Sequence, residues 1–192
     1  MPIRPPRAPA IERSQYHGRR MSEAEYLALP EEKPYLEYVD GVAVQKAMPN
    51  RTHGRLQRKA LVEFDRYGES HGGECWAEGR VWLPGSGDYR LPDVAYWAAD
   101  KPQGDDRRSL PPTVAIEIAS PGESVDAQRA KCRAFRQNGV DVCWLIDPET
   151  RSDEVFEGDR DGVPLTSGGA LTSVHLPDFL LPLAALWSVL DS

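Results

Sequence analysis

The spacing of apolar residues changes along the chain, and the changes separate strands from helices. Two alternating segments, 35–39 and 42–47, flank Asp40-Gly41, a dipeptide typical of the tight turn in a β-hairpin. The apolar residues that follow recur at helical spacing, which predicts a helix from about residue 50 to residue 67. They are Leu56, Ala60, Leu61 and Phe64.

The rest of the chain continues this contrast. A first helix, over 22–29, begins with the capping-box pattern of Ser22 and Glu25. The later predicted elements are strands over 75–83 and 89–97, a polar loop over 100–112, a strand over 113–119, a helix over 124–138, a strand over 140–146, an edge strand over 154–157 and a final helix over 183–190. Hairpins imply antiparallel pairing, and the unit 113–146 implies a right-handed parallel crossover. We therefore expect an α/β (α+β) fold, a mixed sheet flanked by helices.

The composition is that of a soluble globular protein. The chain has 192 residues, of which 40% are hydrophobic and 28% are charged. We expect a disordered basic tail over 1–20, rich in Pro and Arg, and one folded domain over 21–192. No apolar stretch approaches the roughly 20 residues that span a bilayer, so no membrane association is expected. The three cysteines lack C-x-x-C spacing and the tail lacks the shape of a secretory signal, which favours a reduced, cytoplasmic protein.

Two charged residues occupy positions where burial is expected. Glu117 lies inside the apolar strand 113–119, on the side that also carries small residues. Lys131, on the helix 124–138, shares a face with small apolar residues instead of with the arginines opposite. A buried carboxylate is costly unless it is paired, hydrogen-bonded or bound to a metal. The two residues therefore indicate a structural ion pair or a chemical site, and for Lys131 alone a lysine that snorkels along apolar surface is the simpler alternative.

Asp93 offers a second acid on another predicted strand. It follows Pro92, which has no backbone N–H to donate to a neighbouring strand and so favours a bulge or strand edge, where an acid can point out of the sheet. The alternative is an ordinary turn aspartate at the start of a strand. Mg²⁺ typically takes one or two carboxylates with waters and substrate phosphate. Asp93 and Glu117 therefore predict a Mg²⁺ or Mn²⁺ site, with Lys131 placed to orient or deprotonate a water. Glu37 could add an outer ligand, although the side of its strand that it faces stays open.

Polar residues near the start of the helix over 50–67 are candidates for nucleic-acid contact. His53 could contact phosphate or support a ligand, and a plain helix-start residue is the alternative. Arg51, Arg55 and Arg58 fall on one helical face, which either follows a phosphate backbone or is an ordinary solvated surface. The net charge of −7 argues against broad, non-specific nucleic-acid binding but leaves room for a local basic groove.

Several short motifs, taken in order, resemble one known family. They are Tyr35-Leu36-Glu37-Tyr38-Val39-Asp40-Gly41, His53, Pro92-Asp93-Val94, Glu117-Ile118-Ala119-Ser120-Pro121, Lys131, Gly139-Val140 and Trp144-Leu145-Ile146-Asp147-Pro148. From about Met21 to Trp187 the chain resembles the Uma family of predicted restriction endonucleases, within the PD-(D/E)XK nuclease superfamily. The resemblance implies a restriction-endonuclease-like core, with Asp93 and Glu117 as metal ligands and Glu37 as an additional acid. The superfamily lysine usually stands where this chain has Ala119, and the position on the next helix that the family uses instead matches Lys131.

These observations together predict a metal-dependent endonuclease that hydrolyses phosphodiester bonds in DNA. Its expected catalytic residues are Glu37, Asp93, Glu117 and Lys131. A homodimer is compatible with this function, since two sites are needed to cut both strands at once. The competing interpretation is a non-catalytic nucleic-acid or protein-binding module that retains the nuclease fold, and a third is a hydrolase of another phosphate ester, because fold does not fix function.

Overall fold

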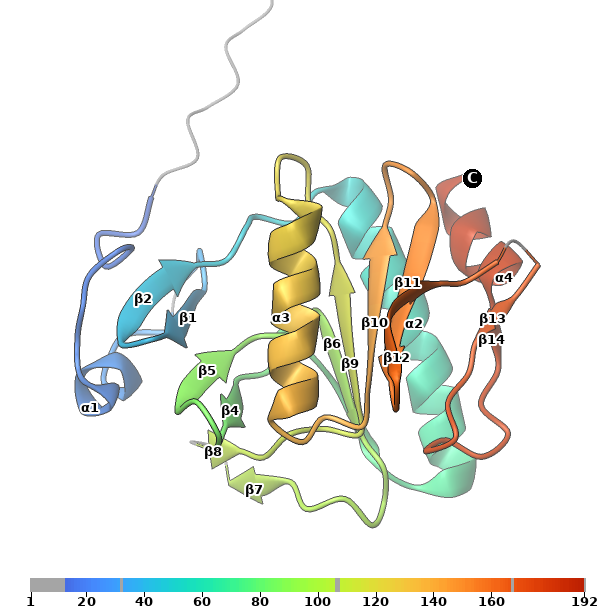
Figure 1. The fold of residues 1–192 in the computed structure, drawn as a ribbon, viewed down its shortest axis with the longest axis horizontal. Helices are drawn as coiled ribbons and strands as arrows, with labels where there is room; N and C mark the ends of the chain where they lie inside the picture. Colours follow the sequence, from blue (N-terminus) through green and yellow to red (C-terminus); the bar gives the residue numbers. More distant parts are fainter. Residues whose placement is uncertain (1–12, 32, 106–107, 167, 192) are drawn as a thin grey trace, which may run out of the picture.

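A six-stranded sheet with the strand order β12-β11-β10-β9-β6-β3 forms the centre of the computed structural model, which describes residues 13–31, 33–105, 108–166 and 168–191 (Figure 1). The strands are β3 (Glu74–Ala77), β6 (Val94–Trp97), β9 (Val114–Ile118), β10 (Val142–Asp147), β11 (Ser152–Glu157) and β12 (Arg160–Pro164). β9 and β10 run parallel, and the other neighbouring pairs are antiparallel. The predicted mixed sheet is therefore confirmed.

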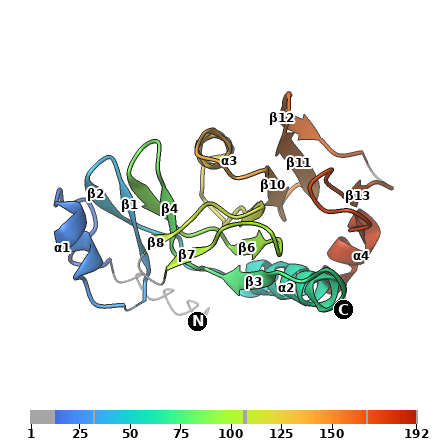
Figure 2. The same cartoon turned by 90° about the horizontal axis from the view of Figure 1, so that it is seen from below.

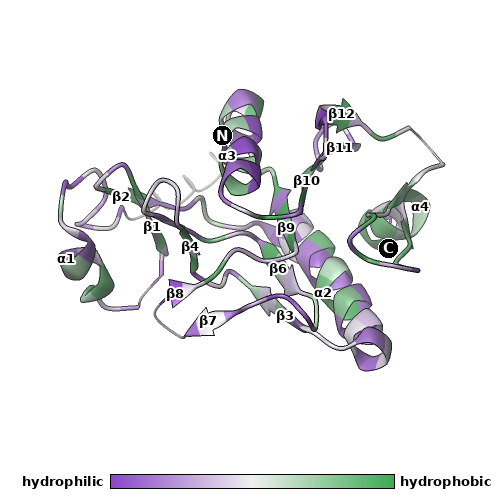
Figure 3. Cartoon of the chain, turned by 60° about the horizontal axis from the view of Figure 1, so that its bottom comes forward, coloured by the Kyte–Doolittle hydropathy of each residue, from purple (hydrophilic) through white to green (hydrophobic). Residues whose placement is uncertain are grey.

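Two long helices cover opposite faces of this sheet (Figures 1 and 2). α2 (Arg51–His71) packs on one face, and α3 (Val125–Gln137), which connects β9 to β10, packs on the other. Asn50 and Ser124 cap the two helices, since each side chain accepts a hydrogen bond from a backbone N–H in the first turn. Figure 3 shows hydrophobic and hydrophilic residues interleaved along both helices, as amphipathic helices require.

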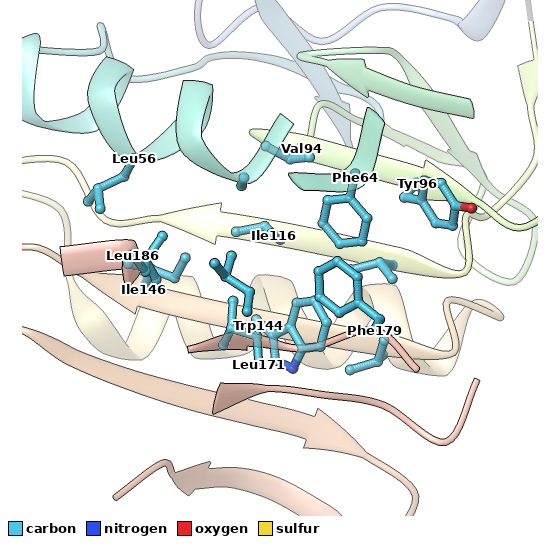
Figure 4. Close-up of a cluster of buried hydrophobic side chains, with 14 of the residues drawn as sticks. Leu56, Phe64, Val94, Tyr96, Ile116, Trp144, Ile146, Leu171, Phe179 and Leu186 are labelled. Carbon is cyan, nitrogen blue, oxygen red and sulfur yellow. The ribbon is translucent and has the colours of Figure 1, made fainter. Parts of the chain in front are cut away.

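Side-chain alternation along the central strands builds a separate core on each face. On the α2 face, the Phe64 ring stacks on Tyr96 and Phe179, with ring centroids 5.0 and 4.7 Å apart (Figure 4). The α3 face buries Val81, Leu83, Ala95, Trp97, Ala115, Cys132, Phe135, Val140, Cys143, Leu145 and Phe156. Because Asp93 is in phase with Ala95, and Glu117 with Ala115, both acids point to the α3 face.

A second six-stranded sheet, with the order β2-β1-β5-β4-β8-β7, adjoins the first. Its strands are β1 (Leu36–Val39), β2 (Val42–Gln45), β4 (Val81–Leu83), β5 (Asp88–Arg90), β7 (Gly104–Asp105) and β8 (Arg108–Ser109). The predicted turn joins β1 to β2, and its residues Asp40 and Gly41 both have positive φ, 50° and 78°. The short helix α1 (Glu23–Leu27) packs on this sheet through Tyr26, whose ring stacks on Tyr38 at 5.1 Å.

The two strands predicted over 75–83 and 89–97 are each divided between the two sheets. Their outer parts, β3 and β6, pair in the central sheet, and their inner parts, β4 and β5, pair in the second sheet. One break lies at Glu78, which has a φ of 52°, and the other at Pro92, which has no N–H to donate. The ribbon therefore passes from one sheet to the other beside Asp93.

The ends of the domain differ from the predictions in detail. Residues 13–20, expected in the disordered tail, contact β2: Gly18 N–H donates to the Ala43 carbonyl at 2.8 Å. Residues 1–12 lie outside the described residues. β11, expected at an edge, is paired on both sides, and the loop over 100–112 contains β7 and β8. The C-terminal segment contains β13 (Ala170–Leu171), β14 (Leu181–Pro182), α4 (Leu183–Trp187) and the short 3-10 helix η1 (Ser188–Leu190). Of the helices in the described ranges, none combines the length and apolarity needed to cross a bilayer.

Candidate active site

Asp93 lies at the start of β6 with 1% of its surface exposed. Its Oδ2 atom accepts a hydrogen bond from the backbone N–H of Ile118 at 2.6 Å, which ties it to β9 next to Glu117. The register that pairs Val94 with Ile116 places the two acids on adjacent strands. The side chain of Gln57 donates to the Asp93 carbonyl at 2.9 Å and so fixes the backbone at the strand end. Asp93 therefore lies in the bend immediately before β6, and its side chain is held against β9.

Glu117, Lys131 and Glu37 form one buried cluster. Lys131 Nζ lies 2.7 Å from Glu37 Oε1 and 3.0 Å from each oxygen of Glu117. The lysine therefore does not snorkel to solvent. Glu37 also accepts hydrogen bonds from the Leu91 N–H at 2.9 Å and from Arg90 at 3.2 Å. The orientation that the sequence left open for Glu37 is toward the cluster.

Lys131 reaches the cluster from the edge of the buried face of α3. That face is centred on Gln128, Cys132 and Phe135, whereas Ala127 and Ala130, two of the small apolar residues expected on it, are exposed. The predicted face is thus rotated, because the bulkier Cys132 and Phe135 pack into the core and the small alanines do not need to. This rotation leaves the Lys131 ammonium beside the ends of β6 and β9.

Lys46 is a member of the site that sequence reasoning missed. Its Nζ atom lies 2.6 Å from Asp93 Oδ1 and 3.7 Å from Glu78 Oε1. A signal for it exists in the hairpin: the Asp40-Gly41 turn pairs Glu37 with Val44, and residues two apart on a strand face the same way. Once Glu37 points into the site, Lys46 must point there too.

Of the residues considered for nucleic-acid contact, His53 is the one at the acids. It is buried, and its Nε2 atom lies 3.1 Å from Asp93 Oδ2. Arg51 and Arg58 lie on the exposed side of α2, and Arg55 donates to the Val189 carbonyl in η1 at 3.1 Å. His53 lies opposite that stripe on the helix, so none of the three arginines is among the described residues lining the cavity.

A polar cavity of about 200 Å³ opens over the acids. Its lining comes from both sheets and both long helices, and includes Glu37, Lys46, His53, Asp93, Glu117, Ser120, Gln128 and Lys131. Gln128 stands one helical turn before Lys131 and is 7% exposed. Its Oε1 atom has no hydrogen-bond partner within the described part of the chain, so it is free to accept one from a bound molecule.

Burial raises and nearby cations lower the pKa of both acids, but the balance differs between the two. Burial opposes the ionisation of Asp93, but Lys46 and His53 outweigh it and hold the pKa of Asp93 well below its usual range. Burial raises the pKa of Glu117 above its ordinary value, against the attraction of Lys131. Burial likewise disfavours the charged form of Lys131, yet Glu117 and Glu37 raise its pKa above the ordinary value. The cavity thus combines tightly packed charges of both signs.

These groups fit a hard divalent cation. Two buried carboxylates on adjacent strands suit Mg²⁺, which completes its shell with waters and substrate oxygens. Glu117 Oε1 faces Lys131 without hydrogen-bond geometry and has no other hydrogen-bond partner among the residues described, so one oxygen is available as a ligand. Within the same residues no three His, Cys, Asp or Glu side chains form a ready metal cluster. The fit therefore rests on two acids and solvent.

Comparison with known proteins identifies the family and the fold of the chain. A family model for Uma2, described as "Putative restriction endonuclease", matches residues 23–185. A crystal structure of "a putative nuclease belonging to DUF820" from Anabaena variabilis ATCC 29413 has a TM-score of 0.76 at 22% sequence identity, and covers 87% of this chain and 97% of that chain. No curated protein matches. The fold is thus that of this nuclease-like structure, and the match over residues 23–185 shows that the chain belongs to the Uma2 family.

Proposed function

We propose that this protein is a metal-dependent endonuclease that hydrolyses phosphodiester bonds in DNA. The observation that carries the proposal is the pair Asp93 and Glu117, two buried acids on adjacent strands of one cavity with Lys131 beside them. A structural ion pair needs one acid and one base, whereas this cavity holds three buried acids and two lysines around open space. Membership of the Uma2 family supports the same reaction class.

Each residue has a distinct part in the proposed reaction. Asp93 and Glu117 would hold Mg²⁺ or Mn²⁺, which polarises the phosphoryl oxygen and lowers the pKa of a bound water. The Lys131 ammonium orients the attacking water and balances the charge that develops on the phosphate. Glu37 holds Lys131 in place through the 2.7 Å contact. His53 and Lys46 fix Asp93 from two sides.

A cleavage assay with a matched control tests this assignment. Plasmid, linear duplex and single-stranded DNA are incubated with Mg²⁺, Mn²⁺ or EDTA, and the wild type is compared with Glu117→Gln. Glu154→Gln is the control, because Glu154 is also a buried β-strand glutamate held by a cation, Arg129, but lies outside the cavity lining. We expect EDTA and Glu117→Gln to abolish cutting and Glu154→Gln to retain it.

The other outcomes separate the alternatives. Cutting that survives both EDTA and Glu117→Gln would defeat the assignment. If the wild type cuts no substrate, calorimetric titration with Mg²⁺ decides further: no heat of binding favours a non-catalytic module with the nuclease fold. Gel filtration with and without duplex DNA tests the proposed homodimer, which would allow both strands to be cut in one encounter.

A further inference from the structure

A second cavity, of about 230 Å³, lies beside the active site. We call it the tyrosine pocket, and its walls include Tyr26, Glu31, Tyr35, Glu78, Arg80 and Leu91. Leu91 joins it directly to the acid cluster. The Leu91 N–H donates to Glu37 and its carbonyl accepts from Lys131 at 3.4 Å, while the residue also lines the pocket. One residue therefore separates the two cavities.

A second route between them runs past a narrow recess that shares lining residues with both cavities. Tyr35 and Glu78 line both the tyrosine pocket and this recess, and Lys46 lines both the recess and the active-site cavity. Lys46 itself bridges the two ends, since it contacts Asp93 at 2.6 Å and Glu78 at 3.7 Å. A chain molecule with one group at Asp93 could thus place the neighbouring group in the pocket.

Two aromatic rings beside this route each have a cation over one face. The Arg80 guanidinium lies 5.3 Å from the centre of the Tyr26 ring, and the Lys33 ammonium lies 5.3 Å from the centre of the Tyr35 ring. The carboxylates are offset by cations, because Glu31 lies 3.4 Å from Arg80 and Glu78 lies near Lys46. Aromatic rings interleaved with cations are the usual surface for single-stranded nucleic acid, whose bases stack while its phosphates pair.

The size of the pocket limits its occupant. At about 230 Å³ it is below the roughly 300–1,000 Å³ of sites for drug-sized ligands, so it suits one small planar group. A nucleobase is such a group, with two faces for stacking. The amino groups on its edge can donate hydrogen bonds to a carboxylate, and its carbonyl oxygens or ring nitrogens can accept hydrogen bonds from an arginine.

We propose that the tyrosine pocket receives one unpaired base of the strand being cut, next to the scissile phosphate. The inference rests on the proposed nuclease function and adds the substrate class to it. A paired base is stacked inside the duplex, and it has to unpair and unstack before it can enter a pocket, which costs free energy. Single-stranded or locally unpaired DNA is therefore the preferred substrate.

Binding of a short fluorescent single strand in EDTA, followed by anisotropy, tests the pocket without cleavage. Tyr35→Ala removes a half-buried ring, and stacking is worth about 1–3 kcal/mol per base, so we expect binding to weaken about 5- to 150-fold. Tyr35→Phe keeps the ring and should bind as the wild type does. Tyr16→Ala is the matched control, because Tyr16 is also half-buried beside a cation, Arg19, but lies outside the pocket. Arg80→Gln provides a second variant should Tyr35→Ala fold poorly by circular dichroism.

Cleavage of matched single-stranded and duplex substrates completes the test. We expect Tyr35→Ala to lower the single-strand to duplex ratio while Tyr16→Ala leaves it unchanged. If the wild type cuts DNA but Tyr35→Ala and Arg80→Gln change neither this ratio nor single-strand binding, the pocket proposal is wrong and the nuclease proposal stands. If the wild type cuts nothing but Tyr35→Ala loses single-strand binding, the pocket still receives a base of single-stranded DNA, and the calorimetric Mg²⁺ titration described above decides the nuclease proposal.

Discussion

Asp153 offers a quantitative test of the structure away from the active site. It lies in β11 with 1% of its surface exposed, and its Oδ2 atom accepts a hydrogen bond from Trp187 Nε1 at 3.1 Å. Oδ1 has no hydrogen-bond partner among the residues that the structure describes. Burial therefore raises the pKa of Asp153 from 3.8 to about 6, against the effect of Trp187. In the folded protein the carboxyl group keeps its proton to a higher pH than in the unfolded chain.

The sign of the effect on stability follows from this difference. Above pH 3.8 the unfolded chain releases the proton while the folded protein still holds it, so rising pH favours unfolding until the folded group also ionises near pH 6. At about 1.4 kcal/mol for each unit of pKa, the full loss is about 3 kcal/mol. Most of it, about 2 kcal/mol, falls between about pH 4 and pH 8.

Asp153→Asn removes the titration and keeps an acceptor for Trp187. The free energy of unfolding of both proteins is measured by urea denaturation with tryptophan fluorescence across this pH range, at low protein concentration near the pI of 5.2. We expect the stability of the variant relative to the wild type to rise by about 2 kcal/mol from the acid to the alkaline end. A constant cost of the buried amide cancels in this comparison. Two parallel stability curves would refute the reasoning.

Three other substitutions test separate parts of the molecule. Lys46→Met should weaken Mg²⁺ binding about 10- to 100-fold in calorimetry because Asp93 loses a partner that orients it, whereas Lys59→Met, which breaks a half-buried helical pair with Glu63, should not. Gly41→Ala should lower the melting temperature through a loss of about 1 kcal/mol, because φ is 78° there and the new Cβ would lie 3.1 Å from Arg20; an unchanged melting curve would contradict the turn geometry. Phe64→Ala should cost about 3–5 kcal/mol in urea denaturation, since the ring is fully buried, and a loss below about 1 kcal/mol would argue against the stacked core.

The sequence was sufficient to predict elements whose signals are local. The Asp40-Gly41 turn and the Ser22 capping box depend on a few neighbouring residues, and both have the expected geometry. A lysine among alanines singles out Lys131, although the structure buries Cys132 and Phe135 on that side of the helix and leaves Ala127 and Ala130 exposed. The order of strands in the two sheets depends on contacts between distant residues, which no local pattern encodes. The sequence therefore predicts the two strands over 75–83 and 89–97 but not their division between the two sheets.

The same limit explains which site residues were found. Glu117 is conspicuous within an apolar run. Lys46 stands at the end of a hairpin whose sequence gives no sign of burial, and only the strand register with Glu37 shows that it faces the site. The arginine stripe of α2 has the right spacing for a phosphate-binding face, but the orientation of the helix turns it away from the cavity. Spacing defines a face, and tertiary packing decides what that face meets.

The cavity takes its residues from both sheets, and this makes it sensitive to the unfolding of either sheet alone. Glu117 belongs to the central sheet and Asp93 immediately precedes its strand β6, while Glu37 belongs to β1 and Lys46 directly follows β2 in the second sheet. Local opening of the β1–β2 hairpin would separate Glu37 and Lys46 from Asp93 and Glu117 without unfolding the central sheet. The proposed activity should therefore correlate better with the protection of β1 and β2 from hydrogen exchange than with the global free energy of unfolding. Substitutions that weaken this hairpin should inactivate the protein while the central sheet is still folded.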